Sequence, residues 1–179
     1  HKADIIHEAL QTSRDTLFLD SDIFILDEIN DIDNSKDLGV SPHYIRDSDV
    51  KRYGYYNGGV VWTKNAKITE SWKKYTVHSR YVDQASLEDL VKDFSFFEFG
   101  ENYNFSWWRV KQSSVSPQEI VSNISIKEKT ILYKNKPLKF VHTHFNNNDS
   151  MYRHFNVLIV NLLQKCKRYR ELLCLTRMI

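Results

Sequence analysis

Residues 16–26 read Thr16-Leu-Phe-Leu-Asp20-Ser-Asp22-Ile-Phe-Ile-Leu26, an apolar segment that holds two carboxylates two positions apart. A strand this apolar is expected to be buried, where two like charges repel and each is costly to desolvate. In an extended chain Asp20 and Asp22 point the same way and Ser21 points opposite. Either the strand ends at a surface at Asp20, or a cation lies between the two acids.

The composition is that of an ordinary globular protein. Of the 179 residues, 41% are hydrophobic and 27% are charged, and the formal net charge of +2 gives no support to nucleic-acid binding. Cys166 and Cys174 match neither a disulfide framework nor a zinc-ligand set, so we expect a reducing, cytoplasmic compartment. No apolar run is long enough to span a membrane.

Strands alternate with helices along the chain, which favours the α/β class. We expect a core over residues 1–150 and a basic amphipathic helix over 151–179 that packs on it. The expected strands are 16–19, 37–42, 60–63, 95–100, 130–133 and 138–145, and the other expected helices are 2–13, 66–79 and 83–94. Residues 101–123 show an irregular pattern.

The last helix has a broad apolar face at helical spacing. This face either packs on the domain or, with the basic residues around it, docks on an anionic membrane surface through Leu172, Leu173 and Leu175. The residues of the apolar face are Phe155, Leu158, Ile159, Leu162, Leu163 and Cys166.

Three further patterns carry candidate chemistry. Two glycines in Asn57-Gly58-Gly59 remove side chains where a backbone approaches something closely, and they predict a turn or bulge that leads into a strand. Asp83-Gln84 stands at an expected helix start. His142 and His144 alternate in a strand, so both face one way, and one of them is expected to bind an ion directly.

Four motifs, in their order along the chain, resemble those of the GT-A fold glycosyltransferases. They are Phe18-Leu-Asp-Ser-Asp22, Asn57-Gly-Gly59, Asp83-Gln84 and the histidine strand at 140–145. These enzymes are nucleotide-diphospho-sugar transferases, and the likeness is to the glycogenin-like and lipopolysaccharide galactosyltransferase families. The resemblance covers most of residues 1–150 and implies a Rossmann-like α/β fold. A βαβ portion that binds the base precedes Asp-x-Asp in those families. Only nineteen residues precede Asp20 here, so we expect a fold that is partial at its N-terminus or completed by a second polypeptide.

The resemblance implies a metal-dependent hexosyltransferase that uses Mn²⁺ or Mg²⁺. Asp22 would coordinate the ion directly, and Asp20 would bind the same ion or the nucleotide ribose, with Ser21 between them in the cofactor site. His142 or His144 would be the third protein ligand. The donor would be a nucleotide sugar, most readily a UDP-sugar, and the acceptor a glycan or a lipid-linked glycan.

The resemblance also implies roles on the sugar side. Asn57, Gly58 and Gly59 would form the floor of the site, and Asp83 would hydrogen-bond the hydroxyls of the donor sugar. Gln84 would lie near the anomeric carbon, as in retaining members. On position and composition, the acceptor side is assigned to Asn102, Asn104, Trp107, Trp108 and Arg109, and contacts to the diphosphate are assigned to Asn146, Arg153 and His154.

Two other interpretations remain open. A haloacid-dehalogenase-type phosphatase also places Asp-x-Asp after an apolar strand, with the first acid, here Asp20, as nucleophile. A non-catalytic transferase relic or carbohydrate-binding subunit would bind a nucleotide sugar without turnover.

Overall fold

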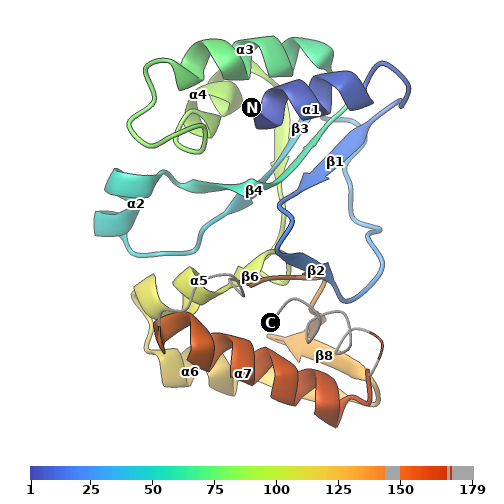
Figure 1. The fold of residues 1–179 in the computed structure, drawn as a ribbon, viewed down its shortest axis with the longest axis vertical. Helices are drawn as coiled ribbons and strands as arrows, with labels where there is room; N and C mark the ends of the chain where they lie inside the picture. Colours follow the sequence, from blue (N-terminus) through green and yellow to red (C-terminus); the bar gives the residue numbers. More distant parts are fainter. Residues whose placement is uncertain (144–149, 169, 171–179) are drawn as a thin grey trace. The chain divides into compact units, whose positions relative to one another are not determined.

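A computed structural model describes residues 1–143, 150–168 and 170 of the chain (Figure 1). The chain forms two compact units. Unit 1 comprises His1–Asp20 and Ile29–Gly100, and unit 2 comprises Ser21–Glu28 and Glu101–Ile179. The polypeptide therefore passes from one unit to the other three times, and the first passage falls between Asp20 and Ser21.

Unit 1 is built on a four-stranded sheet in the order β1-β4-β3-β5. The central strand β4 (Tyr56–Thr63) is buried along its whole length and runs antiparallel to β1 (Thr16–Leu19) and to β3 (Leu38–Pro42). β5 (Phe96–Glu98) adds to β3 in parallel. β1 is an edge strand of this sheet, so its residues are partly buried, where the sequence predicts a buried strand.

Helices cover the sheet of unit 1, and Figure 1 shows α1 (Lys2–Ala9), α3 (Ala66–Thr76) and α4 (Leu87–Asp93) gathered on one side of it. α2 (Asp47–Tyr53) is a short helix between β3 and β4 that buries none of its residues. The buried core of the unit consists of Ala3, Ile6, Leu38, Val40, Tyr56, Val61, Ile68, Trp72, Leu87 and Leu90.

Unit 2 contains two small sheets. In the first, β10 (Phe140–His142) pairs antiparallel with β2 (Ile23–Ile25) and parallel with β6 (Phe105–Ser106). The second sheet is an antiparallel meander of β7 (Ile124–Lys127), β8 (Thr130–Tyr133) and β9 (Lys136–Pro137).

Three helices complete unit 2, namely α5 (Trp107–Gln112), α6 (Pro117–Ser122) and α7 (Ser150–Lys165). The predicted apolar face of the last helix is confirmed, because five of its six members are buried and Leu158 packs beside them. The core of the unit consists of Leu26, Phe105, Trp107, Ile120, Ile131, Tyr133, Leu138, Val141, Phe155, Ile159, Leu162, Leu163 and Cys166. Leu172, Leu173 and Leu175 lie outside the described residues.

All four predicted helices differ from the observed ones at their ends. The first ends at Ala9, because the amides of Gln11 and Thr12 bond to carbonyls three residues back and close a tight turn. The helix expected over 66–79 ends at Thr76, and the helix expected over 151–179 ends at Lys165. The helix expected over 83–94 begins at Leu87, not at Asp83. Val82 has a φ of 37°, a left-handed conformation that no α-helix accommodates, so Asp83 lies in a turn. Residues 101–123, which look irregular in sequence, contain the short helices α5 and α6.

Within residues 1–143, 150–168 and 170, every helix is too short or too polar to cross a lipid bilayer. The division into a core over residues 1–150 and a C-terminal helix over 151–179 stays a prediction.

Candidate functional site

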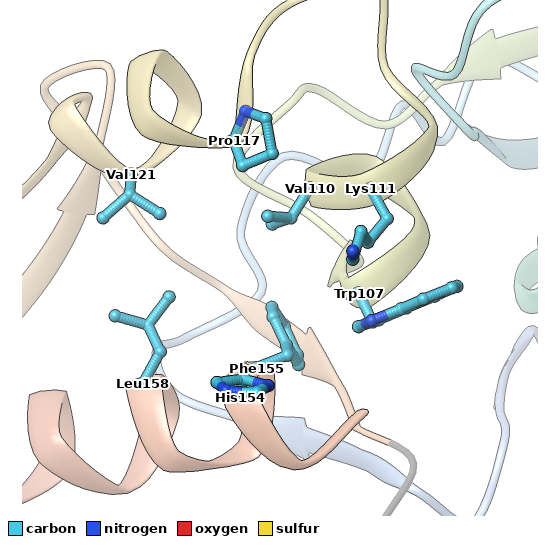
Figure 2. Close-up of a pocket in the computed structure, with 8 residues that line it drawn as sticks. All are labelled: Trp107, Val110, Lys111, Pro117, Val121, His154, Phe155 and Leu158. Atoms are coloured by element: carbon cyan, nitrogen blue, oxygen red, sulfur yellow. The ribbon is translucent and has the colours of Figure 1, made fainter. Parts of the chain in front are cut away.

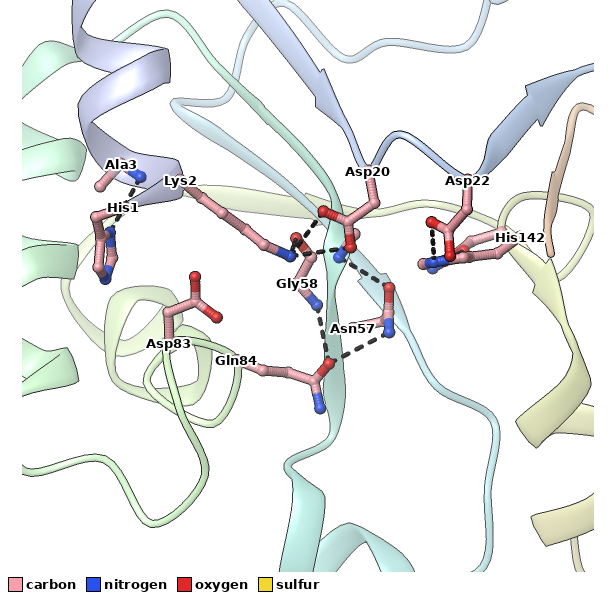
Figure 3. Close-up of polar contacts among 12 residues, drawn as sticks. His1, Lys2, Ala3, Asp20, Asp22, Asn57, Gly58, Asp83, Gln84 and His142 are labelled. Carbon is pink, nitrogen blue, oxygen red and sulfur yellow. Dashed lines mark hydrogen bonds and ion pairs between the residues drawn. The ribbon is translucent and has the colours of Figure 1, made fainter. Parts of the chain in front are cut away.

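In unit 2 the strand pairing of β2 with β10 sets Asp22 beside His142. His142 lies opposite Ile23 in the antiparallel register, so the residue before Ile23 falls next to the imidazole. Thr143 fixes the backbone there, since its amide and its hydroxyl both donate to the carbonyl oxygen of Asp22, at 2.9 and 2.8 Å. The result is a distance of 3.0 Å between Asp22 Oδ1 and His142 Nε2 (Figure 3).

Two neighbours hold the imidazole of His142, which is only 3% exposed. The side-chain oxygen of Asn104 lies 3.0 Å from its Nδ1 atom. The indole of Trp108 meets the ring edge-on, with 4.7 Å between the ring centroids. The ring is therefore fixed on two sides and presents Nε2 to the Asp22 carboxylate.

In unit 1 Asp20 follows directly on β1 and is paired with Lys2 of α1. The Lys2 ammonium lies 2.8 Å from Oδ1 and 3.0 Å from Oδ2 of Asp20, and it also donates to the carbonyl oxygen of Gly58 at 2.9 Å (Figure 3). The backbone amide of Asp20 donates to the carbonyl of Gly59, which extends the pairing of β1 with β4 by one residue. Ser21 is exposed.

The covalent chain brings Asp20 close to the Asp22–His142 pair. Consecutive Cα atoms are about 3.8 Å apart, so two residues place the Cα atoms of Asp20 and Asp22 within about 7.6 Å of each other. Asp20, Asp22 and His142 can each offer one ligand atom to the same ion. Two carboxylates and one imidazole form a ligand set suited to a divalent cation.

The Asn57-Gly58-Gly59 segment lies inside β4, and the register of β3 against β4 shifts between Val40 and Ser41, opposite it. The predicted irregularity is therefore a bulge within the sheet. Asn57 accepts the amide of Gly59 through Oδ1 at 2.8 Å. Its Nδ2 atom lies 3.1 Å from Nε2 of the buried His43, whose Nδ1 donates to the carbonyl of Gly54.

Gln84 is bound to the same segment. Its amide oxygen accepts from Asn57 Nδ2 at 3.2 Å and from the Gly58 amide at 3.3 Å, and its nitrogen donates to the carbonyl of Tyr53 at 2.8 Å. Asp83 is held through its backbone carbonyl, which accepts from Trp72 Nε1 and from Ser86 Oγ, both at 2.7 Å. Within the described part of the chain, no hydrogen bond or ion pair engages the Asp83 carboxylate.

A charged pair stabilises the segment that carries Asp83 and Gln84. Glu88 lies 2.6 Å from Arg80 Nη1 and accepts the amide of Tyr55 at 2.8 Å. Burial alone would raise the pKa of Glu88, but the Arg80 guanidinium and the Tyr55 amide outweigh it and leave that pKa below its ordinary value.

Unit 2 also contains a pocket of about 540 Å³ between α5, α6 and α7 (Figure 2). This volume lies in the range typical of small-molecule sites. The lining is mostly apolar, with Lys111 and His154 as its charged or titratable members. The eight lining residues are Trp107, Val110, Lys111, Pro117, Val121, His154, Phe155 and Leu158.

Several residues assigned to the acceptor and diphosphate sides have other positions. Asn102 and Arg109 are buried in unit 2, where Asn102 donates to the carbonyl of Pro137 and Arg109 binds backbone carbonyls of residues 101–104. Arg153 is exposed. His144 and Asn146 lie outside the described residues.

Three residues at the site are absent from the sequence interpretation, namely Lys2, His43 and Thr143. Lys2 reaches Asp20 across eighteen residues and His43 reaches Asn57 across fourteen. No local pattern marks such contacts. One signal could have identified Thr143 as the residue that binds the Asp22 carbonyl. Thr143 directly follows His142, whose strand pairs with the segment after Asp22.

Comparisons with known proteins bear on the fold. No protein-family model matches the chain, and no curated protein matches it significantly. Among solved structures, the chain is similar to a crystal structure of the galactosyltransferase LgtC in complex with donor and acceptor sugar analogues. The TM-score is 0.50 and the sequence identity is 15%, over 93% of this chain and 65% of the LgtC chain.

The predicted fold class is confirmed, because the chain has an α/β fold like that of a GT-A glycosyltransferase. The chain spans 65% of the length of the LgtC chain. The narrower assignment to glycogenin-like or lipopolysaccharide galactosyltransferases stays a prediction. The phosphatase interpretation gains no support from the structural comparison.

Proposed function

We propose that this chain carries the metal and donor site of a glycosyltransferase that moves a sugar from a nucleotide-diphosphate donor to an acceptor. The observation that carries the proposal is the pair of Asp22 and His142, held 3.0 Å apart by strand pairing and by Thr143. Asp22 stands two residues after Asp20 in the chain. A carboxylate and an imidazole fixed in this way are ready to share one cation.

The ligand set fits a divalent ion of the size and hardness of Mn²⁺ or Mg²⁺. Carboxylate oxygens suit both ions, and the imidazole favours Mn²⁺, since Mg²⁺ prefers oxygen ligands throughout. Asp20, Asp22 and His142 would hold the ion. When bound, it supplies the positive charge that stabilises a departing nucleoside diphosphate.

The donor sugar would lie over the bulged part of β4. Gly58 presents backbone without a side chain, and Gln84 holds that backbone by accepting a hydrogen bond from the Gly58 amide. The Asp83 carboxylate, which no described residue engages, is available to accept from sugar hydroxyls. A UDP-sugar is the donor we propose, and transfer with retention is the outcome that Asp83-Gln84 suggests.

The apolar pocket of unit 2 supports a lipid-linked acceptor over a bare glycan. Trp107, Phe155 and Leu158 offer apolar surface for a hydrocarbon segment, and Lys111 offers a cation for an adjacent anionic group. Figure 2 shows Lys111 extending from α5 toward α7.

A second candidate function is sugar binding without transfer, and the engagement of Gln84 favours it. Both acceptor positions of the Gln84 amide oxygen are taken by the fold, so this side chain already has a purely structural use.

Calorimetry with Mn²⁺, followed by a panel of nucleotide sugars, tests both functions. We expect Mn²⁺ to bind the wild type, and Asp22→Asn or His142→Ala to weaken that binding by at least about tenfold. The matched controls are Asp31→Asn and His78→Ala, which alter exposed residues of the same types. Transfer of sugar to water or to an acceptor identifies a transferase, and donor binding without turnover identifies the second function. Full Mn²⁺ affinity in Asp22→Asn contradicts the metal site.

A further inference from the structure

Asn104 is buried at the bottom of the histidine site, with a relative exposure of 1%. Its side-chain oxygen lies 3.0 Å from His142 Nδ1, on the side of the ring opposite to the Asp22 carboxylate. An amide oxygen only accepts hydrogen bonds. The Nδ1 atom is therefore the donor of this contact. The Nε2 atom faces the Asp22 carboxylate, which also only accepts, so a cation between Nε2 and that carboxylate would take the place of a second ring hydrogen.

The backbone of Asn104 is held in an uncommon conformation. Its φ is 48°, in the left-handed region that Asn tolerates better than most residues. The buried guanidinium of Arg109 donates to the carbonyls of Glu101, Tyr103 and Asn104, so it pins the turn that carries the strained residue. Such conformations persist where the surrounding structure holds them firmly.

Two further contacts help to hold the ring in this orientation. β6 begins directly after Asn104 and pairs in parallel with β10, with Ser106 opposite His142. Trp108, two residues further on, packs edge-on against the imidazole. One short segment, residues 104–108, thus supplies the hydrogen-bond acceptor, the neighbouring strand and the aromatic wall around His142.

We propose that Asn104 is the positioning residue of the metal site, which holds His142 in the Nδ1–H tautomer so that Nε2 faces Asp22 and a shared divalent cation. The inference rests on the proposed metal site and deepens it. Histidine ligands generally donate their second ring N–H to an oxygen, and loss of that partner typically weakens metal binding by about 10- to 100-fold.

The first test reads the tautomer itself by ¹⁵N NMR of the His142 side chain in the protein saturated with diamagnetic Mg²⁺. The wild type should show the hydrogen on Nδ1. Asn104→Gly keeps the left-handed backbone accessible and removes the acceptor, so at the same Mg²⁺ concentration fewer rings should be coordinated and the hydrogen should shift toward Nε2. Asn104→Asp keeps an oxygen in place and should retain the Nδ1–H form.

The second test is calorimetry with Mn²⁺. Asn104→Gly should bind Mn²⁺ about 10- to 100-fold more weakly than the wild type, and Asn104→Asp should not. Asn135→Gly is the matched control, because Asn135 also has a left-handed φ, of 63°, but lies exposed in the turn between β8 and β9. It should leave both readouts unchanged.

The two readouts separate failure of this inference from failure of the metal site. A wild-type ring with its hydrogen on Nε2 overturns the role of Asn104 without any variant. Equal Mn²⁺ affinity in Asn104→Gly and wild type also overturns it, while leaving the metal site standing. If the wild type binds neither Mg²⁺ nor Mn²⁺, the proposed function fails, and this inference fails with it.

Discussion

The ammonium group of Lys2 lies within 3.0 Å of both carboxylate oxygens of Asp20 and donates to the Gly58 carbonyl as well. One side chain from the first helix thus neutralises an acid of the candidate metal site and ties it to the bulged strand. A cation that binds Asp20 has to compete with this ammonium.

We therefore predict that Lys2→Met raises the affinity for Mn²⁺. A partly exposed ion pair contributes up to about 1 kcal/mol, so the gain should be about two- to fivefold and should shrink as salt screens the charges. Calorimetry at low and high ionic strength measures it. Lys67→Met, an exposed change on α3, is the control. Unchanged affinity at low salt would show that Lys2 does not compete with the ion.

The glycines of unit 1 should separate stability from ligand binding. At Gly54, with a φ of 95°, an added Cβ would lie 2.9 Å from the backbone of Ala85. Gly54→Ala should therefore lower the free energy of unfolding by about 1–3 kcal/mol. At Gly58 an added Cβ meets its nearest neighbours at 3.6 Å, an ordinary contact.

Gly58→Ala should consequently fold with nearly wild-type stability, while the added methyl group occupies space on the proposed floor of the donor site. We expect the dissociation constant for the nucleotide sugar to rise about tenfold or more, measured by calorimetry beside urea denaturation. If donor binding is unaffected in a stably folded Gly58→Ala, the sugar lies elsewhere.

Gln84→Ala should destabilise unit 1. It removes the hydrogen bonds to Asn57, to the Gly58 amide and to the Tyr53 carbonyl, and partly buried groups left without partners cost about 1–3 kcal/mol. Chemical denaturation measures the loss against Gln118→Ala, an exposed change in α6 that should matter by less than about 0.5 kcal/mol. A stability change no larger than that of the control would show that Gln84 is not the support that its contacts indicate.

The pair of Glu88 and Arg80 gives unit 1 a pH-dependent contribution to stability. The folded pKa of Glu88 lies below its ordinary value of 4.5, so its contribution is present above pH 4.5 and is lost as the pH falls through the folded pKa. Glu88→Gln should be less stable than the wild type at neutral pH, by no more than about 1 kcal/mol because the pair is partly solvated. Thermal unfolding from pH 7 to pH 3 should show the two proteins converging, and a constant difference would contradict the assignment.

Local sequence patterns predicted the strand before Asp20, the central strand β4, the bulge at its glycines and the apolar face of α7. These features depend on residue spacing within one element. The turn at Asp83 is not predicted from the sequence, because it depends on a left-handed conformation at Val82. A β-branched residue rarely adopts that conformation, so valine gives no local signal of it. The contacts of Lys2 with Asp20 and of Asn104 with His142 depend on tertiary packing, which spacing along the chain does not encode.

The pairing of β2 with β10 also bears on how the protein is made. Thr143, which binds the carbonyl of Asp22, is synthesised 121 residues after it. At about 5–20 residues per second, β10 is synthesised roughly 6–24 s after β2. The synthesis of unit 1 is completed during this interval. Unit 1 can therefore fold before the partner strand of β2 exists. Asp22 therefore becomes fixed only after Thr143 has been synthesised, and a chain that stops before Thr143 has no route to a finished cation site.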